Sequence, residues 1–461
     1  MSDQATPIDR RWLAARLRRH TSELLRLAWP TILSRLGIIA MAIVDTVMVG
    51  RYATNHLAYL NLGNGTMIMV ALVTALGMLM GTMVYTANAF GRGDLEGCGE
   101  VFKRSMPYAL AVGAAGMLIC LPGEAWLYVM GQEAELVSEG GRIMRILAFG
   151  LPGYMVYVGC LFFLEGVKRP AVGMAMMVVA NLVNVVLNYA LIFGKLGAPE
   201  LGAAGSAWTT TVMRTGLGIG AFAYIWFSPS LRIYGVRGWA RSRWSEWAGQ
   251  RKLGYATGVA LCAEVAAFAA MTIFAGWLGT LAVAAYGLAL SVISAIFMVA
   301  AGIGAATSVR VGIAHSRADR ADTALAGWSG VGLVAIVIGI AAIVLNLVPR
   351  QVVLLYSDDI ALIAVTVPLV AFAGVVLIFD GAQTALSNAL RGLSETWAPT
   401  TIQVVSYMFV MIPVSYWLAI VLQEGVMGLL KGIVIGSLVS TVLQSWRFYW
   451  MTGGGWRAPA G

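Results

Sequence analysis

Long apolar stretches separated by short polar segments follow one another along almost the whole chain. A helix that crosses a membrane needs about 20 predominantly apolar residues. The pattern therefore predicts an all-α polytopic membrane protein with twelve transmembrane helices. The twelve predicted spans cover about residues 24–50, 59–89, 105–130, 142–165, 171–193, 201–227, 253–278, 282–309, 326–348, 361–390, 399–422 and 425–450.

The longest polar interruption divides the predicted helices into two sets of six. Because six is an even number, both sets insert in the same direction, and we expect two lobes related by internal pseudo-two-fold symmetry about the membrane normal. The expected parts are a cytoplasmic N-terminal tail over 1–23, a lobe over 24–227, a cytoplasmic linker over 228–252, a lobe over 253–450 and a cytoplasmic C-terminal tail over 451–461.

Two short sequence matches indicate an internal repeat. GRYATNHLAYLNL, over 50–62, resembles GWLGTLAVAAYGL, over 276–288, and LEGVKRPAV, over 164–172, resembles LRGLSETWA, over 390–398. Each match is short, but the step from 50 to 276 is as long as the step from 164 to 390. A constant shift over so long a distance favours duplication of a six-helix unit.

Composition and charge agree with a membrane protein. The chain is 59% hydrophobic and 11% charged, and its mean hydropathy is +0.80. Its net charge of +9 comes from basic residues in short segments between apolar stretches, which argues against a nucleic-acid surface. Apart from Arg35 and Arg214, 23 lysines and arginines fall on the side of the N-terminus and 6 on the other, so we expect both termini in the cytoplasm.

Three acidic residues, Asp45, Glu264 and Asp380, lie within predicted spans with no charged residue in the five positions on either side. An ionisable group at membrane depth costs at least about 2.5–3.5 kcal/mol and is a functional-site hypothesis by default. A polar residue that only holds helices together is the alternative for any one of them. Three such residues in one chain favour a path or binding site for a cation.

In the first lobe, several polar residues are expected at the depth of Asp45. Asn181, Asn184 and Asn188 share one face of their predicted helix, and Thr210 enters the membrane at a comparable level. Carboxylate, amide and hydroxyl oxygens suit Na⁺, whereas the carboxylate alone would suit a proton. We therefore expect a cation site, with an interhelical hydrogen-bond network as the alternative.

The second lobe carries a different pair. Glu264 and Asp380 are both predicted near the bilayer midplane, at similar distances from the cytoplasmic ends of their helices. The shift that relates the repeats carries Asp45 to Met271, so the two lobes have diverged in chemistry. If the two carboxyl groups face each other, their mutual repulsion favours the sharing of one proton.

Other polar residues give no sign of an enzyme or a cofactor site. His20, His56 and His315 are expected in the tail or in loops, without metal-ligand spacing, and the sequence has no P-loop. Any transport would therefore be driven by an ion gradient. Two arginines, Arg35 and Arg214, lie inside spans, and we expect Arg35 to extend towards the inner surface.

At this point the residues resemble the multidrug and toxic compound extrusion (MATE) family in its NorM-like branch, over about residues 22–450. AWPTILSRLGIIAMAIVDTVMVGRYATNHLAYLNLG is similar to the family's first helix and the loop after it. Pro30 is expected to open that helix. ANAFGRGDLE is similar to its helix 2–3 turn, NLVNVVLNYALIFG with LGAAGSAWTT to its helix 5–6 hairpin, and FDGAQTALSNALRG to its tenth helix.

The resemblance implies a monomeric antiporter of the bacterial cytoplasmic (inner) membrane that exports amphipathic, often cationic compounds in exchange for H⁺ or Na⁺. Its partners would be these small molecules and membrane lipids. The implied cation-binding residues are, in the first lobe, Asp45, Asn184, Asn188 and Thr210, which would also hold any Na⁺, and, in the second, Glu264 and Asp380.

One departure from the family's pattern bears on the ion. Some members place a tyrosine one turn before the acidic residue of the tenth helix, where this chain has Val376. Since valine supplies no oxygen, the second lobe favours H⁺, while the first leaves Na⁺ open. A lipid-linked oligosaccharide flippase of the same superfamily is the alternative function, although its pyrophosphate would need more basic residues than Arg35 and Arg214.

Overall fold

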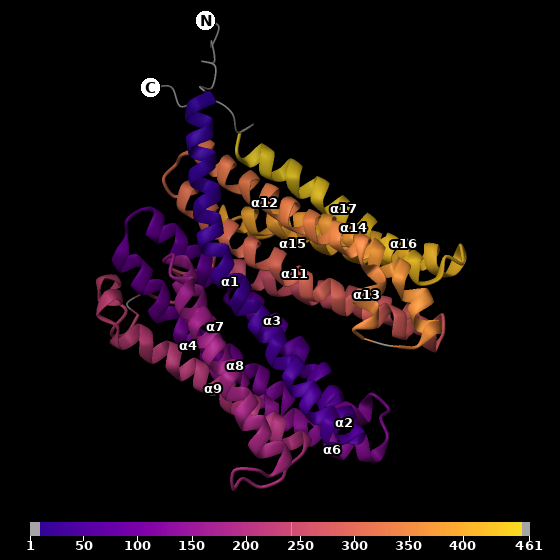
Figure 1. Ribbon diagram of the computed structural model, residues 1–461. Coiled ribbons are helices and arrows are strands. Elements are labelled where there is room, and N and C mark those ends of the chain that lie inside the picture. Colours follow the sequence, from indigo (N-terminus) through magenta and orange to yellow (C-terminus); the bar gives the residue numbers. More distant parts are fainter. Residues whose placement is uncertain (1–9, 241, 357, 454–461) are drawn as a thin grey trace, which may run out of the picture. The chain divides into compact units, whose positions relative to one another are not determined.

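The computed structural model describes residues 10–240, 242–356 and 358–453, and the regular structure in these ranges is entirely helical (Figure 1). The outer parts of the two predicted tails, together with Arg241 and Ser357, lie outside the described residues. The chain forms two compact units. One comprises the described residues up to Ile32 and those from Val259 onward, and the other comprises residues 33–258.

The borders between the units fall inside two long helices, α1 (Arg10–Tyr52) and α10 (Ala248–Trp277). The unit of residues 33–258 also contains α2 (Thr54–Gly65), α3 (Met67–Gly91), α4 (Leu95–Cys120), α5 (Gly123–Val129), α6 (Ala134–Ala148), α7 (Leu151–Gly166), α8 (Pro170–Phe193), α9 (Ala203–Phe227) and the 3₁₀ helix η1 (Pro229–Tyr234).

The other unit contains the remaining helices. Its second-last span contains two π-helical segments, one near the middle and one at its end. The elements are α11 (Thr280–His315), α12 (Arg320–Leu347), α13 (Pro349–Leu354), α14 (Ile360–Gly392), α15 (Ala398–Val404), η2 (Val405–Met411), α16 (Ile412–Tyr416), η3 (Trp417–Val421) and α17 (Gly425–Met451).

Each of the twelve predicted spans coincides with one helix or with consecutive helices. Among the described residues, nine helical segments are long and apolar enough to cross a membrane. Two further pairs qualify together but are bent, α4 with α5 by 54° and α6 with α7 by 42°. The remaining span, α9, is less apolar because it carries three consecutive threonines and Arg214. The predicted all-α membrane fold class is confirmed.

Local sequence explains several helix ends. Asp94, Asp319 and Asp359 accept hydrogen bonds from backbone N–H groups in the first turns of α4, α12 and α14. Gly194 follows α8 with a φ of 63°, a conformation that glycine adopts without a steric penalty. These short signals fix where helices begin and end, while hydropathy fixes which of them can cross a membrane.

Helix α1 begins earlier than the hydropathy pattern suggests. It starts at Arg10, so Pro30 lies inside the helix and does not open it as predicted. Apolar periodicity locates the membrane-embedded part of a helix, but it gives no information about a polar extension of the same helix. His20, which the sequence placed in a tail, lies in this extension and is buried, as are Leu24 and Leu27 at the start of the predicted span.

Buried charged groups join the start of α1 to α11 and α12. His20 Nε2 lies 2.9 Å from Asp322 Oδ1, and its Nδ1 lies 3.0 Å from Arg310 Nη2. Arg19 Nη2 donates to the same Asp322 oxygen at 2.6 Å, and Arg310 also pairs with Glu23. We call His20, Glu23, Arg310 and Asp322, with Arg19, the α1–α12 charge network. It anchors the polar start of α1 within one unit.

Glycines allow close helix packing within residues 33–258. A Cβ atom on Gly254 would lie 2.1 Å from the carbonyl oxygen of Met78, and one on Gly81 would lie 2.2 Å from the carbonyl oxygen of Gln250. Real Cβ atoms do not approach an oxygen so closely. Small residues at these positions therefore let α3 and the first part of α10 come into backbone contact.

Candidate functional site

Asp45 lies at the centre of a polar cluster built from three helices of one unit. Asn184 Nδ2 and Asn188 Nδ2, on α8, donate to Asp45 Oδ1 at 3.1 and 2.6 Å. Thr210 Oγ1, on α9, donates to Asp45 Oδ2 at 2.9 Å. The four residues singled out from the sequence of the first lobe are thus brought together in space. We call them the Asp45 cluster.

The Asp45 cluster is almost fully enclosed. Asn184 and Asn188 have no exposed surface, and Asp45 and Thr210 are each 9% exposed. Three donors surround the carboxylate, and charge-assisted hydrogen bonds of this kind stabilise an ionised carboxylate. Asn188 Oδ1 is buried and accepts no hydrogen bond from any described residue. With Asp45, the Thr210 hydroxyl and the Asn184 carbonyl it offers hard oxygen ligands for a small cation.

Two neighbouring polar residues, Asn181 and Arg214, make their described contacts with groups other than Asp45. Asn181, predicted on the same helical face, donates to the carbonyl oxygen of Gly37 at 3.0 Å and so joins α8 to α1 rather than reaching Asp45. Arg214 lies one turn beyond Thr210, and its guanidinium carbon is 5.6 Å from the centre of the Tyr154 ring. From there its positive charge acts electrostatically on Asp45.

The second pair of acids lies in the other unit. Asp380 Oδ1 accepts hydrogen bonds from Tyr407 Oη at 2.9 Å and from Ser437 Oγ at 3.2 Å, and Asp380 is only 3% exposed. Glu264 Oε2 accepts a hydrogen bond from Gln403 Nε2 at 2.8 Å. Each carboxylate thus has its own hydrogen-bond donors, and no hydrogen bond joins the two carboxyl groups among the described residues.

Tyr407 is the main residue that sequence reasoning missed. It lies in the π-helical segment η2, shortly before Pro413. A proline removes a backbone N–H donor, and π-helical segments are frequent at functional sites. Its phenol supplies the oxygen that Val376 lacks, so the argument against Na⁺ from Val376 loses its basis. In the sequence, Pro413 shortly after Tyr407 was the one signal that could have pointed to this residue.

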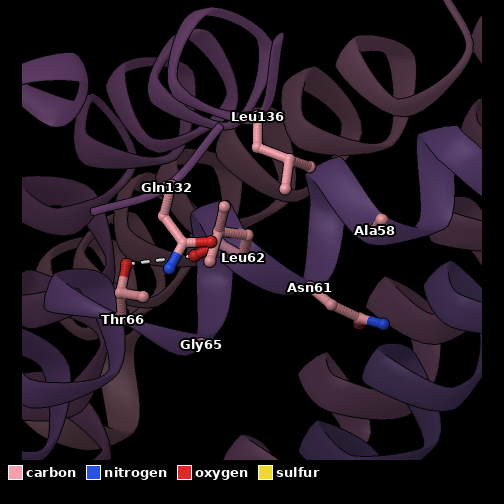
Figure 2. Close-up of a pocket in the computed structure, with 7 residues that line it drawn as sticks. All are labelled: Ala58, Asn61, Leu62, Gly65, Thr66, Gln132 and Leu136. Atoms are coloured by element: carbon pink, nitrogen blue, oxygen red, sulfur yellow. Dashed lines mark hydrogen bonds between the residues drawn. The ribbon is translucent and has the colours of Figure 1, made fainter. Parts of the chain in front are cut away.

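The unit of residues 33–258 also has a surface pocket of about 430 Å³, whose lining includes no residue of the Asp45 cluster (Figure 2). Within it the Thr66 hydroxyl donates to the carbonyl oxygen of Leu62 at 3.0 Å. Its lining has no charged side chain. The pocket is lined by Ala58, Asn61, Leu62, Gly65, Thr66, Gln132 and Leu136.

Comparison with known protein families decides the class of the chain. The MatE family profile matches residues 30–190 and 256–417, which together make up more than half of the sequence. The chain belongs to the MatE family. The two matches in this MatE chain begin at 30 and 256, and the same shift relates the short sequence repeats. The resemblance drawn from the sequence is therefore confirmed.

Relatives of this MatE chain carry consistent names. It is 36% identical over 428 residues to a protein of Caulobacter vibrioides named "Probable multidrug resistance protein NorM", a match that covers 92% of this chain and 90% of that protein. It is 30% identical over 450 residues to "Multidrug resistance protein PmpM" of Pseudomonas aeruginosa, covering 95% and 92% of the two chains.

Solved structures show the same fold. "Crystal structure of MATE in the straight conformation" matches 95% of this MatE chain and 97% of its own, with a TM-score of 0.87 and 18% identity. "Crystal structure of eukaryotic MATE transporter AtDTX14" matches 94% and 96%, with a TM-score of 0.84 and 20% identity. The chain therefore has the twelve-helix, two-lobe fold of MATE transporters and is an integral membrane protein.

Proposed function

We propose that this MatE-family chain is a cation-coupled antiporter that exports amphipathic, often cationic compounds in exchange for H⁺ or Na⁺. The observation that carries the proposal is the buried carboxylate of Asp45, held by Asn184, Asn188 and Thr210. An enclosed acid at membrane depth is costly to maintain without a role. The relatives named as multidrug resistance proteins support the substrate class.

In the proposed cycle, the Asp45 cluster binds the coupling ion from one side of the membrane. It releases the ion on the other side, where the concentration of that ion is too low to keep the site occupied. A proton would bind the carboxylate directly. With Na⁺, the side-chain amides would turn so that their oxygens, rather than their N–H groups, face the carboxylate and bind the ion. The amide groups of Asn184 and Asn188 can present either a donor or an acceptor, so the same cluster serves both ionic states. The Glu264 and Asp380 pair forms the second ion-responsive site.

Transport by alternating access follows from the same proposal. The two repeats, residues 24–227 and 253–450 with the linker 228–252 between them, would expose the substrate site first to one side and then to the other. The distribution of basic residues supports cytoplasmic termini in a bacterial inner membrane. We propose a monomer as the functional unit, since each chain carries both repeats.

The test is dye efflux from proteoliposomes under separately imposed gradients. A pH gradient in Na⁺-free buffer and a Na⁺ gradient at constant pH are each applied to protein oriented in the vesicle membrane. Efflux under the first alone identifies H⁺ as the coupling ion, and efflux under the second alone identifies Na⁺. Substrate movement that needs neither gradient would overturn the antiporter proposal, and movement of a lipid-linked oligosaccharide under those conditions would identify a flippase.

A further inference from the structure

A buried polar face runs along α14 from Asp380 to the end of the helix. Asp380, Gln383, Ser387 and Arg391 recur at helical spacing, three or four positions apart, so they lie on one side of α14. Each is at most 5% exposed. An apolar core cluster takes Leu386, Ala389 and Leu390 from the same turns, and Ala389 lies on the side of α14 opposite Asp380 and Ser387. The polar face is thus specific to one side of the helix.

Helix α17 supplies a matching polar face. Ser437 donates to Asp380, and Thr441 Oγ1 donates to the carbonyl oxygen of Phe379 at 3.1 Å. Near the end of both helices, Arg447 Nη2 donates to Glu395 Oε1, just beyond α14, at 2.9 Å. The two helices therefore run side by side in the same direction (Figure 1). Ser440 and Gln444, one and two turns after Ser437, have no exposed surface.

Several polar atoms on these two faces have no partner within the described chain. They are Ser387 Oγ, Gln444 Oε1, and the Nε and Nη2 atoms of Arg391. A buried polar group without a hydrogen bond is destabilising, and most such groups in native proteins are paired with protein or ordered water. Their alignment between Asp380 and the end of α14 points to one shared partner rather than to isolated defects.

We propose that the seam between α14 and α17 holds a chain of ordered water that links Asp380 to the membrane surface where both helices end. We call it the α14–α17 seam. The positive charge of Arg391, which acts on Glu264, disfavours a resident metal cation at the far end, so we assign the seam to water. Asp380 would then exchange protons with one side of the membrane through the seam. This role rests on the proposed ion-coupled function.

Accessibility to a water-sized thiol reagent tests the seam without any transport measurement. The four native cysteines, Cys98, Cys120, Cys160 and Cys262, are replaced by alanine. Ser387→Cys, Gln444→Cys and the control Ala389→Cys are then exposed to Ag⁺ in proteoliposomes. Ala389 is fully buried in the apolar cluster on the same helix. After solubilisation, the remaining thiol is counted with a maleimide label.

We expect the thiols at positions 387 and 444 to react at least about tenfold faster than the one at 389, because close-packed apolar contacts leave no aqueous route. The reaction should proceed from the side on which α14 ends. Equal rates at the three positions would overturn the seam. Because positions 387 and 444 are tested separately, the thiol reaction at one of them still tests the seam if the other variant folds poorly.

Efflux driven by a pH gradient separates the seam from the proposed function. Gln444→Leu should slow the exchange of protons at Asp380 and reduce efflux, and Ag⁺ should reduce the efflux of Ser387→Cys below the rate that the same variant shows without Ag⁺. If the thiols react but the unmodified protein transports nothing, the proposed function fails and the seam stands. If the protein transports but the thiols stay unreactive, the seam alone fails.

Discussion

At the scale of single residues, the two acidic clusters differ in how their carboxylates are held. Asp45 is surrounded by two amides and a hydroxyl from two helices, while Asp380 receives a phenol and a serine hydroxyl. Amides and hydroxyls can each donate to a carboxylate or present an oxygen to a cation. The two clusters therefore hold their acids with different side chains, and both contain oxygen atoms that can face an ion.

Asp45→Asn should abolish gradient-driven efflux while the protein still folds. The amide keeps the size of the side chain and removes the charge that would bind the ion. We expect a loss of at least about tenfold in efflux rate in proteoliposomes, which corresponds to about 1.4 kcal/mol. The thermal midpoint in detergent serves as the folding control. Efflux at the unmodified rate would refute the role of Asp45.

Tyr407→Phe should lower stability because it removes one hydrogen bond to buried Asp380. The loss of one such bond costs about 0.5–1.5 kcal/mol, and a charged acceptor takes the value towards the upper end. The matched control is Tyr286→Phe, since Tyr286 is also buried but its hydroxyl bonds to no described group. Thermal unfolding in detergent measures both. A larger loss for Tyr286→Phe would contradict the assignment.

At the scale of helices, close packing and buried charge fix the framework around the sites. Gly254 and Gly81 bring α3 and the start of α10 into backbone contact. In the other unit, the α1–α12 charge network holds the polar start of α1 against its neighbours. Helices in a membrane gain little from the hydrophobic effect between themselves, so such contacts decide which helices pair.

Gly254→Ala should destabilise the protein even though alanine favours helices. A new methyl group would lie 2.1 Å from the carbonyl oxygen of Met78. Overpacking of this kind costs about 1–3 kcal/mol and outweighs the gain of about 0.5–1 kcal/mol in helix propensity. The control on the same helix is Gly276→Ala, where no described atom lies within 4 Å of the new Cβ. Only the first variant should lose thermal stability.

Asp322→Asn should destabilise the start of α1. Asp322 is 5% exposed, forms an ion pair with Arg19 and lies within hydrogen-bond distance of His20, so its neutralisation leaves Arg19 without this ion-pair partner and weakens the contact to His20. We expect a cost of about 1–3 kcal/mol. The control is Glu424→Gln, which breaks the exposed pair with Lys431 and should cost about 0–1 kcal/mol. Equal effects on thermal unfolding would mean that the network contributes no more than a surface pair.

At the scale of the whole molecule, each compact unit contains one acidic cluster, and each of the two matches to one family profile falls almost wholly within one unit. The shift along the chain that relates the repeats does not relate the acids, since Met271 stands at the position of Asp45. The two repeats thus share their arrangement of helices but differ in the positions of their acidic residues. An ion-coupled transporter with two different ion-responsive units is the result that we propose.

Asp45→Asn and Asp380→Asn should not combine additively if one transport cycle uses both units. Steps that act in series lose function as soon as one fails, so the double variant should be no slower than the slower single variant. Efflux under the effective gradient measures the three variants beside the unmodified protein. Independent losses that multiply in the double variant would show that the two clusters act in separate processes.

The sequence by itself determined the membrane class, the positions of the twelve spans, the repeat and the residues of the Asp45 cluster. Hydropathy and helical spacing are local properties, and a lone acid in an apolar stretch is visible without any partner. Asn184 and Asn188 could be added because they share a helical face, and Thr210 because it enters the membrane at a depth comparable to that of Asp45.

Only the tertiary structure decided which distant groups complete each site. Tyr407 lies 27 residues from Asp380, Ser437 lies 57 residues from it, and Gln403 lies 139 residues from Glu264. His20 and Asp322 are separated by 302 residues. Hydrogen bonds between helices depend on how the helices pack and rotate, and a local pattern along one helix contains no information about the residue that faces it.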